Sequence, residues 1–257
     1  MNQKEKQLVE LLTTLRTEYG ATAMKASLEA EGILPYELLR TKEITMAAGI
    51  GMTIKVGGCE ALTDARMSRG FGVNALMAPM IESRFALEKF LTMAESVFPA
   101  EELADMLLLI NIETVDGCQK IDDILRAENI GLLSGIVLGR TDLGNALKVS
   151  DVDSPAVLEL ARDLFTKAKE KSLRCIVGGG LSAKTVPFLK ELTGLVDGFE
   201  TRKVVFADFM SRERPAEEAI RLALQAERLW YLLRQETYLA LAQEDAGRIR
   251  KLEKQIG

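Results

Sequence analysis

Two kinds of segment alternate along the chain from residue 21 onward. Short apolar runs that end in polar residues are followed by longer segments in which apolar residues recur at the spacing of a helix. Each short run has the length and continuity of a strand that is buried on both faces. Seven strands are predicted in this way, at residues 21–28, 52–57, 75–80, 107–114, 135–139, 174–178 and 198–205.

Helical segments lie between the predicted strands. They include residues 35–48, 84–97, 119–127, 155–171 and 185–192, and several begin with Ser, Asp or Pro in the first turn. This order favours a (β/α)8 TIM-type barrel of parallel strands over an open doubly wound sheet, although such a sheet would give a similar pattern. The eighth strand is not identified. An atypical first strand, with a helix over residues 1–20 in its place, is one explanation.

The C-terminal segment follows a different pattern. Residues 216–255 are helical almost throughout, with repeated Leu residues among many charges, and they include Trp230 and Tyr231. Because this is too long for one barrel helix, we divide the chain into a barrel catalytic domain, residues 1–215, and a helical extension, residues 216–257. The extension either lies on its own barrel or packs on a neighbouring subunit. Its apolar stripe predicts a homo-oligomer.

Composition narrows the range of functions. A content of 47% hydrophobic residues in 257 can fill a substantial core. The net charge of −5 comes from interspersed charges, so neither a nucleic-acid nor a basic membrane-surface footprint is indicated. A signal peptide and a membrane-spanning apolar run are both missing, which predicts a cytoplasmic protein. The three cysteines, Cys59, Cys118 and Cys175, are far apart and resemble ordinary core residues.

Histidine is absent from the sequence, so acid–base chemistry falls to carboxylates, Lys, Tyr, Cys or water on a metal. Glu113 lies at the C-terminal end of the strand that contains the apolar run 107–110, and Asp142 follows the next predicted strand. Because the carboxyl ends of parallel barrel strands face one mouth, the two acids can converge there and, with water and substrate oxygens, hold Mg²⁺ or Mn²⁺. For each of the two acids, the alternative to a metal ligand is a solvated loop residue or a helix cap.

Three motifs surround these acids in a fixed order: KVGGCEALTDARMSRGFGVNALMAPMIES, INIETVDG and GIVLGRTDLGNAL. They resemble the HpcH/HpaI-type 2-oxo-acid aldolase and citrate lyase β-subunit family over roughly residues 24–206, above all in the P-x-x-E-S, I-E-T and G-x-x-D-L elements. Members of that family are (β/α)-barrels of the phosphoenolpyruvate/pyruvate superfamily. They make or break a carbon–carbon bond beside a metal-bound enolate.

The resemblance implies roles by position. It implies that Glu113 and Asp142 bind the divalent metal, Mg²⁺ or Mn²⁺. It further implies that Asn111, where many relatives have Gln, contacts the 2-oxo acid, and that the backbone N–H groups of Thr141 and Asp142 bind its carboxylate. Arg140 replaces a Pro common in relatives. It either binds an anionic tail of the substrate or pairs with a neighbouring acid.

Two positions depart from the pattern of the relatives. Lys55 stands where many of them have an Arg that stabilises the enolate, and a lysine lacks the two-pronged donor geometry of Arg. The aldolase branch uses a His in a D-x-E-H-G turn, and the matching stretch LEAEG places Glu31 at that position. Glu31 is therefore the candidate base, acting directly or through a metal-bound water. Glu29 is the competing candidate, and a solvated acidic loop is the alternative for both.

Charged residues also crowd the last predicted strand, where Arg202 either faces the mouth or joins an internal ion pair. Taken with the resemblance, the sequence predicts a metal-dependent carbon–carbon lyase, a class II aldolase that forms or cleaves a 2-oxo acid through a metal-bound pyruvate-like enolate. Its expected partners are a small 2-oxo acid, an aldehyde and further copies of itself. A malyl- or citryl-thioester lyase is the alternative among enzymes, and a catalytically silent oligomeric barrel scaffold is the alternative outside them.

Overall fold

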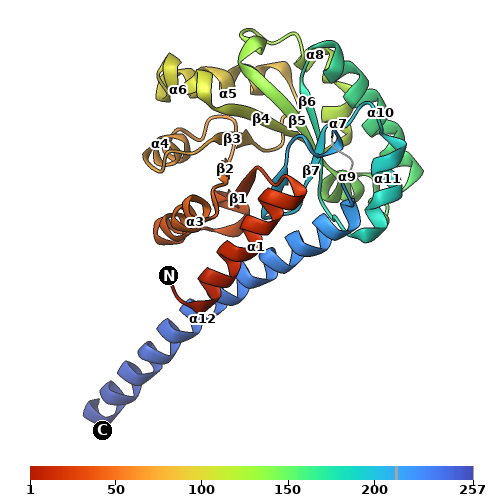
Figure 1. The fold of residues 1–257 in the computed structure, drawn as a ribbon. Helices are drawn as coiled ribbons and strands as arrows, with labels where there is room; N and C mark the ends of the chain where they lie inside the picture. The colour runs from red at the N-terminus through yellow and green to blue at the C-terminus, as the bar shows by residue number, and fades with distance from the viewer. Residues whose placement is uncertain (212–213, 257) are drawn as a thin grey trace.

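Eight strands form one closed barrel in sequence order, with helices around the outside (Figure 1). The structure, a computed structural model, describes residues 1–211 and 214–256. The predicted TIM-type barrel is confirmed. Its strands are β1 (Ala23–Ser27), β2 (Gly51–Lys55), β3 (Ala75–Ala78), β4 (Leu107–Ile112), β5 (Leu133–Gly139), β6 (Arg174–Gly178), β7 (Gly198–Glu200) and β8 (Val204–Phe206).

Twelve α-helices and three short 3₁₀ turns are present in the described residues. The helix predicted over 119–127 is instead two short helices that begin earlier, because the Thr114 hydroxyl accepts a hydrogen bond from the Gly117 backbone N–H at 3.1 Å and caps the first of them. The α-helices are α1 (Gln3–Tyr19), α2 (Leu28–Glu31), α3 (Pro35–Ala48), α4 (Leu62–Gly70), α5 (Arg84–Val97), α6 (Ala100–Asp105), α7 (Val115–Gln119), α8 (Ile121–Ile124), α9 (Arg140–Leu147), α10 (Pro155–Glu170), α11 (Val186–Glu191) and α12 (Ala216–Ile256). The 3₁₀ turns are η1 (Ile130–Leu132), η2 (Ala183–Thr185) and η3 (Phe209–Ser211).

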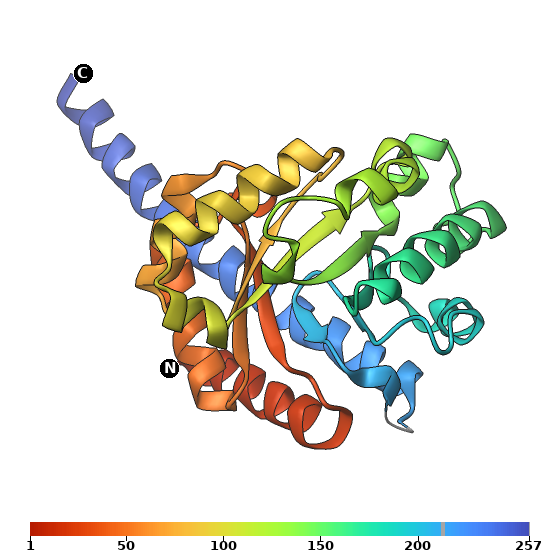
Figure 2. The same ribbon diagram turned by 90° about the horizontal axis from the view of Figure 1, so that it is seen from above.

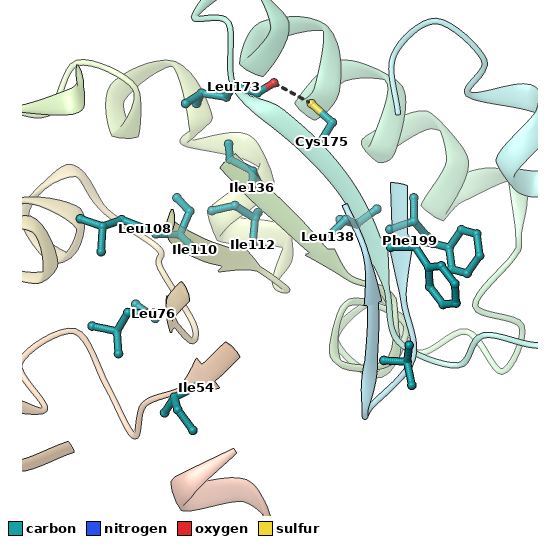
Figure 3. Packing of buried hydrophobic residues seen from close by; sticks show 14 of the residues in the cluster. Ile54, Leu76, Leu108, Ile110, Ile112, Ile136, Leu138, Leu173, Cys175 and Phe199 are labelled. Atoms are coloured by element: carbon teal, nitrogen blue, oxygen red, sulfur yellow. Dashed lines mark hydrogen bonds between the residues drawn. The ribbon is translucent and has the colours of Figure 1, made fainter. Parts of the chain in front are cut away.

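The alternation of side chains along each strand decides which residues face the inside of the barrel. In β4, the side chains of Leu108, Ile110 and Ile112 belong to the large core between strands and helices (Figure 3). Leu109 belongs to a separate apolar cluster inside the barrel. Because successive strand residues face opposite sides, Asn111 and Glu113 continue the inward row of Leu109.

The inside of the barrel has an apolar floor below a polar mouth. The floor consists of Ala23, Ala75, Met77, Leu109, Val137, Ile176, Val205 and Ala207. Toward the carboxyl ends of the strands, the polar residues Lys25, Lys55, Asn111 and Glu200 line a cavity above this floor. The barrel thus excludes water from below and offers polar groups only at its mouth.

The barrel closes differently from the sequence prediction. The single strand expected over 198–205 is two antiparallel strands, β7 and β8, and β8 also pairs antiparallel with β1. A Cβ at Gly198 would lie 1.8 Å from the carbonyl oxygen of Phe206, so glycine is what lets the returning strand approach this closely. The unidentified eighth strand is therefore the last one. The expected atypical first strand is wrong, because β1 pairs in regular parallel register with β2.

The two terminal helices lie side by side on the outside of the barrel and run in opposite directions (Figure 2). Lys4 near the start of α1 pairs with Glu236, and Gly20 after its end lies beside Arg214. The helix predicted over residues 1–20 is confirmed. Its N-terminus has a capping box, in which the Asn2 side chain accepts from the Glu5 backbone N–H at 2.9 Å, and it ends at Gly20 with φ of 74°.

Helix α12 is 41 residues long, and only its first half packs on the barrel. Its buried residues are Ala219, Ile220, Ala223, Ala226 and Trp230. The second half continues past the barrel (Figure 1), with exposed Tyr238, Leu239, Leu241, Ile249, Leu252 and Ile256. Gly257, the last residue of the predicted extension, lies outside the described residues. None of the described helices combines the length and apolarity that crossing a membrane requires.

Candidate active site

A cavity of about 210 Å³ opens at the carboxyl ends of the barrel strands. Its wall contains six of the seven predicted site residues: Glu31, Lys55, Asn111, Glu113, Thr141 and Asp142. A larger hollow, of about 920 Å³, lies on another part of the surface, beside Val73, Asn74 and Met106 at the amino ends of β3 and β4. The structure therefore brings the predicted residues together at the end of the barrel where strand ends converge.

Glu113 is almost fully enclosed, with 3% of its side chain exposed. Lys55 Nζ lies 3.2 and 3.3 Å from its two carboxylate oxygens. The Met80 backbone N–H donates to Oε1 at 3.1 Å, and Asn111 Nδ2 donates to Oε2 at 3.0 Å. A Cβ at Gly139 would lie 2.6 Å from Oε2, so glycine at the end of β5 makes room for this carboxylate. The acid at the end of β4 is thus held in one position by strands on both sides.

Two features beside Glu113 indicate a ligand site. Asn111 is buried, and its Oδ1 has no hydrogen-bond partner within residues 1–211 and 214–256. An unpaired buried amide oxygen costs free energy, which a donor or cation brought by a ligand would recover. Met80 has φ of 51°, a conformation that non-glycine residues rarely adopt, and backbone strain of this kind clusters at functional sites.

The first turn of α9 follows β5 directly and faces the same cavity. Thr141 and Asp142 are exposed there. The first N–H groups of a helix have no acceptor within the helix and carry partial positive charge. Gly179, with φ of 77°, stands opposite them: a Cβ there would lie 2.7 Å from Thr141 N and 2.9 Å from Arg140 N. Glycine keeps the space in front of these amides open, so a carboxylate can bind there.

Arg140 does not have the substrate-binding position predicted for its side chain. The side chain is 0% exposed, and its guanidinium pairs with Asp153. It also donates to the backbone carbonyls of Gly178 at 3.1 Å and Gly179 at 2.6 Å. Burial lowers the pKa of Arg140, and Asp153 opposes this shift. The alternative, pairing with a neighbouring acid, is the one that the structure shows, and the guanidinium fixes the glycine turn opposite α9.

Glu31 reaches the cavity from the end of the short helix α2, which follows β1. Its carboxylate accepts hydrogen bonds from Lys203 Nζ at 2.6 Å, the Tyr231 hydroxyl at 2.7 Å and the Ser27 backbone N–H at 3.1 Å. Burial by itself raises the pKa of Glu31, but the charge of Lys203 and these hydrogen bonds outweigh it, so that the pKa is lowered. Glu31 is therefore held in the ionised form. Glu29, the competing candidate, is exposed and lies outside the cavity wall.

The sequence analysis did not identify the partners of Glu31 and Glu200. Lys25 pairs with Glu200 across the barrel interior, and Lys203 pairs with Glu31. A lysine within the apolar stretch AMKAS was a usable signal, because a charge in a buried strand needs a partner. Tyr231 gave no such signal, since it contacts Glu31 across 200 residues of sequence.

The model of one family, HpcH/HpaI aldolase/citrate lyase, matches residues 48–178, half of the chain. The chain belongs to this family. The part that matches the HpcH/HpaI model includes Lys55, Asn111, Glu113 and Asp142, whereas Glu31 and the segment from β7 to α12 lie outside it. Membership makes the protein an enzyme of the carbon–carbon lyase kind, in a family that is generally dependent on a divalent metal.

Solved structures of the HpcH/HpaI family have the same fold. The HpcH/HpaI aldolase from Desulfitobacterium hafniense DCB-2 is 14% identical, with a TM-score of 0.62 over 77% of this chain and 82% of that one. A HpcH/HpaI aldolase/citrate lyase family protein from Burkholderia cenocepacia J2315 is 14% identical, with a TM-score of 0.61 over 87% and 90%. Citrate synthase SbnG is 14% identical, with a TM-score of 0.58 over 93% and 90%. No curated protein matches the sequence.

Proposed function

We propose that the protein is a metal-dependent class II aldolase that forms or cleaves a 2-oxo acid through a pyruvate-like enolate. One observation carries this proposal: Glu113 and Asp142 line the same small cavity as the open first turn of α9. A short 2-oxo acid presents a carboxylate next to a carbonyl oxygen. The carboxylate would meet the backbone N–H groups of α9, and the carbonyl oxygen would meet a cation held by Glu113 and Asp142.

The donor set fits Mg²⁺ or Mn²⁺. Among the described residues there is no group of three acidic or thiol side chains that could hold an ion, but Mg²⁺ is commonly bound through one or two carboxylates and keeps several waters. Glu113 and Asp142 would supply those carboxylates, and the unpartnered Asn111 Oδ1 is a further oxygen next to Glu113. Lys55 balances the charge of Glu113 in this structure, and a bound cation would take over that role. When bound, the metal would polarise the substrate carbonyl as a Lewis acid.

The surrounding residues would orient the 2-oxo acid. The backbone N–H groups at the start of α9 would hold its carboxylate, in the space that Gly179 leaves open. Asn111 would contact its 2-oxo group from the inward row of β4. Lys55, with 17% of its side chain exposed, would stabilise the negative charge that develops on the enolate oxygen. As a compact point charge it can do this without the fixed two-pronged geometry of an arginine.

Glu31 would move the proton. In the cleavage direction, Glu31 takes the proton from the aldol hydroxyl. In the direction of aldol addition, the protonated Glu31 gives a proton to the new alkoxide. Its lowered pKa keeps it ionised at neutral pH and ready to accept, although it also makes Glu31 a weak base. Lys203 and Tyr231 hold the carboxylate in place from the barrel and from α12.

The size of the cavity favours a small aldehyde over a thioester as the second substrate. Pockets for drug-sized ligands measure about 300–1,000 Å³. A cavity of about 210 Å³ is smaller, so it admits two reactants of a few carbons each, while the long carrier of a thioester would have to lie outside.

We also propose that the protein is a homo-oligomer in which the second half of α12 packs on another copy. This part of the helix would extend about 30 Å past the barrel at about 1.5 Å per residue. Its exposed Leu239, Leu241, Ile249 and Leu252 make no contact that would cover them in the single chain. Exposed apolar residues gathered on one segment are typical of a protein–protein contact.

The function is tested by incubating pyruvate with a panel of aldehydes, with Mg²⁺ or Mn²⁺ and with a chelator. The expected result is a metal-dependent 2-oxo-4-hydroxy acid, detected by mass spectrometry, that is lost in Glu113→Gln. Product formed equally well with the chelator would contradict metal dependence. No product from any aldehyde, together with no cleavage of 2-oxo-4-hydroxy acids, would favour the scaffold.

A further inference from the structure

Carbon–carbon cleavage would leave an enolate whose third carbon must gain a proton before pyruvate can leave. Glu31 would take the proton of the aldol hydroxyl, and Lys55 would face the enolate oxygen. Apart from the two proposed metal ligands, the other charged residues of the cavity wall are Lys25, Glu200 and Arg202. Arg202 is exposed at the mouth, whereas Lys25 and Glu200 are buried within the barrel.

Lys25 and Glu200 form an ion pair inside the barrel, with 11% and 2% of their side chains exposed. Lys25 Nζ donates to Glu200 Oε1, its one acceptor among the residues that the structure describes. An ammonium group has three N–H donors, so two remain for a ligand in the cavity. Because burying two charges costs solvation energy that their attraction recovers only in part, stability alone explains this pair poorly.

The register of the strands places Lys25 at the bottom of the cavity. Ala23, two residues before it on β1, belongs to the apolar floor, and Ser27, two residues after it, lines the cavity. Ser27 lies beside Lys55 of β2, and Lys25 lies beside Thr53. Lys25 is therefore one inward-facing position deeper than Lys55, about 7 Å along the strand direction.

The order of the strands places Lys25 opposite the groups that would hold the 2-oxo acid. The eight strands close in sequence order, so β1 lies across the barrel from β5. Glu113 follows β4, and Asp142 and the first turn of α9 follow β5. A 2-oxo acid held there by its carboxylate and its carbonyl oxygen turns its third carbon away from these strands. That carbon would point toward β1, with Lys25 below it and Glu31 nearer the mouth.

We propose that Lys25 is a catalytic residue that transfers the proton at the third carbon of the enolate. This inference rests on the proposed aldolase function and assigns a second proton-transfer group of the same site. In cleavage, an N–H bond of Lys25 breaks, the electron pair of the carbon–carbon double bond forms the new C–H bond, and the 2-oxo carbonyl is restored.

The protons balance over one cycle of cleavage. The neutral amine of Lys25 takes a proton from water, and Glu31, protonated by the aldol hydroxyl, gives one to water. In the direction of aldol addition, the neutral amine removes a methyl proton of pyruvate. The Lys25–Glu200 pair would thus act on the carbon of the substrate, and Glu31 on the oxygen.

Two reactions of the enolate separate this role from binding of the 2-oxo acid. Exchange of the methyl protons of pyruvate with deuterium, followed by NMR, requires proton transfer at the third carbon. Decarboxylation of oxaloacetate forms the same enolate by breaking a carbon–carbon bond and releasing CO₂. That enolate can leave as enolpyruvate and take its proton from water, so consumption of oxaloacetate does not require Lys25.

Two variants remove the proton donor in different ways. Lys25→Met combined with Glu200→Gln removes the amine without leaving a buried carboxylate unpaired. Lys25→Arg keeps a cation beside Glu200, but a guanidinium is not deprotonated in proteins and cannot transfer the proton. Lys171→Met is the control, since Lys171 is exposed between α10 and β6, at the opposite end of the barrel. Thermal unfolding checks that each variant is folded.

Both Lys25 variants should slow deuterium exchange by about 10²–10⁴-fold and leave the consumption of oxaloacetate nearly unchanged. Lys171→Met should change neither reaction. Wild-type exchange in Lys25→Arg or in the double variant would overturn the proposal, because a pair that only supports the fold can be replaced. An equal loss of exchange and decarboxylation would also overturn it, because the defect would then lie in binding.

Binding of oxalate gives a readout that does not depend on turnover. Oxalate has an oxygen where the enolate has its third carbon, so Lys25 would donate a hydrogen bond to it. Calorimetric titration should show oxalate affinity at least about tenfold weaker in the double variant than in the wild type, the usual cost of losing a charged donor. Unchanged oxalate affinity in the double variant would show that Lys25 does not face this position.

Failure of the proposed function gives a different result from failure of this inference. If the metal-supplied wild type catalyses neither exchange nor decarboxylation, the enolate function falls, and the role of Lys25 falls with it. If the wild type catalyses both reactions and the Lys25 variants exchange at its rate, the function stands and the role of Lys25 alone falls.

Discussion

The two sides of the barrel mouth are built in different ways. On one side, Lys55, Asn111 and Glu113 lie at the ends of the regular parallel strands β2 and β4, and Asp142 lies in the first turn of α9 after β5. On the other side, Glu31 at the end of the short helix α2 is held by Lys203 of the β7–β8 hairpin and by Tyr231 of helix α12. The first side lies within the span that matches the family model, and the second lies outside it.

This difference separates two parts of the chemistry. The regular side carries the groups that would bind the 2-oxo acid and stabilise its enolate. The irregular side carries the group that would move the proton. Because Tyr231 and Arg234 of α12 bond to Glu31, the irregular side also depends on the helix that is proposed to join subunits. The groups that would stabilise the enolate thus lie within the span that matches the family model, and the candidate base lies outside it.

The largest effect is expected on the regular side. Loss of a residue that only supports a metal ligand commonly costs 10–100-fold in affinity, so Glu113→Gln and Asp142→Asn should each weaken Mn²⁺ binding by at least about a hundredfold. Calorimetric titration measures this affinity. Glu113→Gln should also lower the unfolding temperature, because Lys55 loses its partner, whereas the exposed Asp142 can be replaced without that loss. Unchanged Mn²⁺ affinity in both variants would remove the metal site.

On the irregular side, Glu31→Gln should slow carbon–carbon cleavage by about 10²-fold and leave metal affinity nearly intact. It should also cost about 3–5 kcal/mol of stability, because the buried Lys203 is left without a counter-charge. Glu29→Gln is the matched control, since Glu29 is exposed on the same short helix, α2. A larger rate loss in Glu29→Gln than in Glu31→Gln would transfer the proton role to Glu29.

Stability should depend on pH through the same residue. The pKa of Glu31 in the folded protein is below its ordinary value of 4.5, so its ionised form stabilises the fold above that value. This contribution is lost as the pH falls through the folded pKa. The difference in unfolding temperature between the wild type and Glu31→Gln should therefore be largest near pH 7 and shrink below about pH 4.5. A difference that stays constant down to pH 3 would contradict the stabilising role of the ionised carboxylate.

A smaller effect is expected from the glycine that faces α9. Gly179→Ala should weaken oxalate binding by about tenfold, because the added methyl group would occupy the space in front of the α9 amides, each worth roughly one hydrogen bond. Gly194→Ala is the matched control: Gly194 has φ of 85°, similar to the 77° of Gly179, but no atom lies within 4 Å of its added Cβ. Equal effects of the two variants on oxalate affinity would show that the amides are not the carboxylate site.

The smallest effect on the chemistry is expected from removing residues 236–257. The shortened chain keeps Tyr231 and Arg234, so the support of Glu31 remains and the rate of cleavage should stay close to that of the wild type. The assembly should become smaller, as measured by light scattering, because the exposed Leu residues of α12 are lost. A full-length protein that is monomeric at micromolar concentration would refute the oligomer, and an assembly unaffected by the truncation would place the interface elsewhere.

The same contrast explains how much could be predicted from the sequence. Glu113 and Asp142 could be placed because a strand and its following loop are local, and parallel strand ends converge by rule. The turn between β7 and β8 could not be predicted, because each of these strands is only three residues long. The close approach of Gly198 to Phe206 that accompanies the turn is a contact between backbones, which leaves no pattern of side chains in the sequence. For Arg140, pairing with a neighbouring acid was one of the two predicted roles and is the one found, whereas its bonds to backbone carbonyls 38 and 39 residues away could not be predicted from the sequence.

The most direct test of the central claim is the exchange of the methyl protons of pyruvate with deuterium, followed by NMR. An enzyme that forms a pyruvate enolate at Glu113 and Asp142 should catalyse this exchange without any aldehyde. The wild type with Mg²⁺ or Mn²⁺ should therefore lose its methyl proton signal, while the chelator-treated protein and Asp142→Asn should not. Exchange that continues at the wild-type rate in Asp142→Asn, or no exchange by the metal-supplied wild type, would contradict the account.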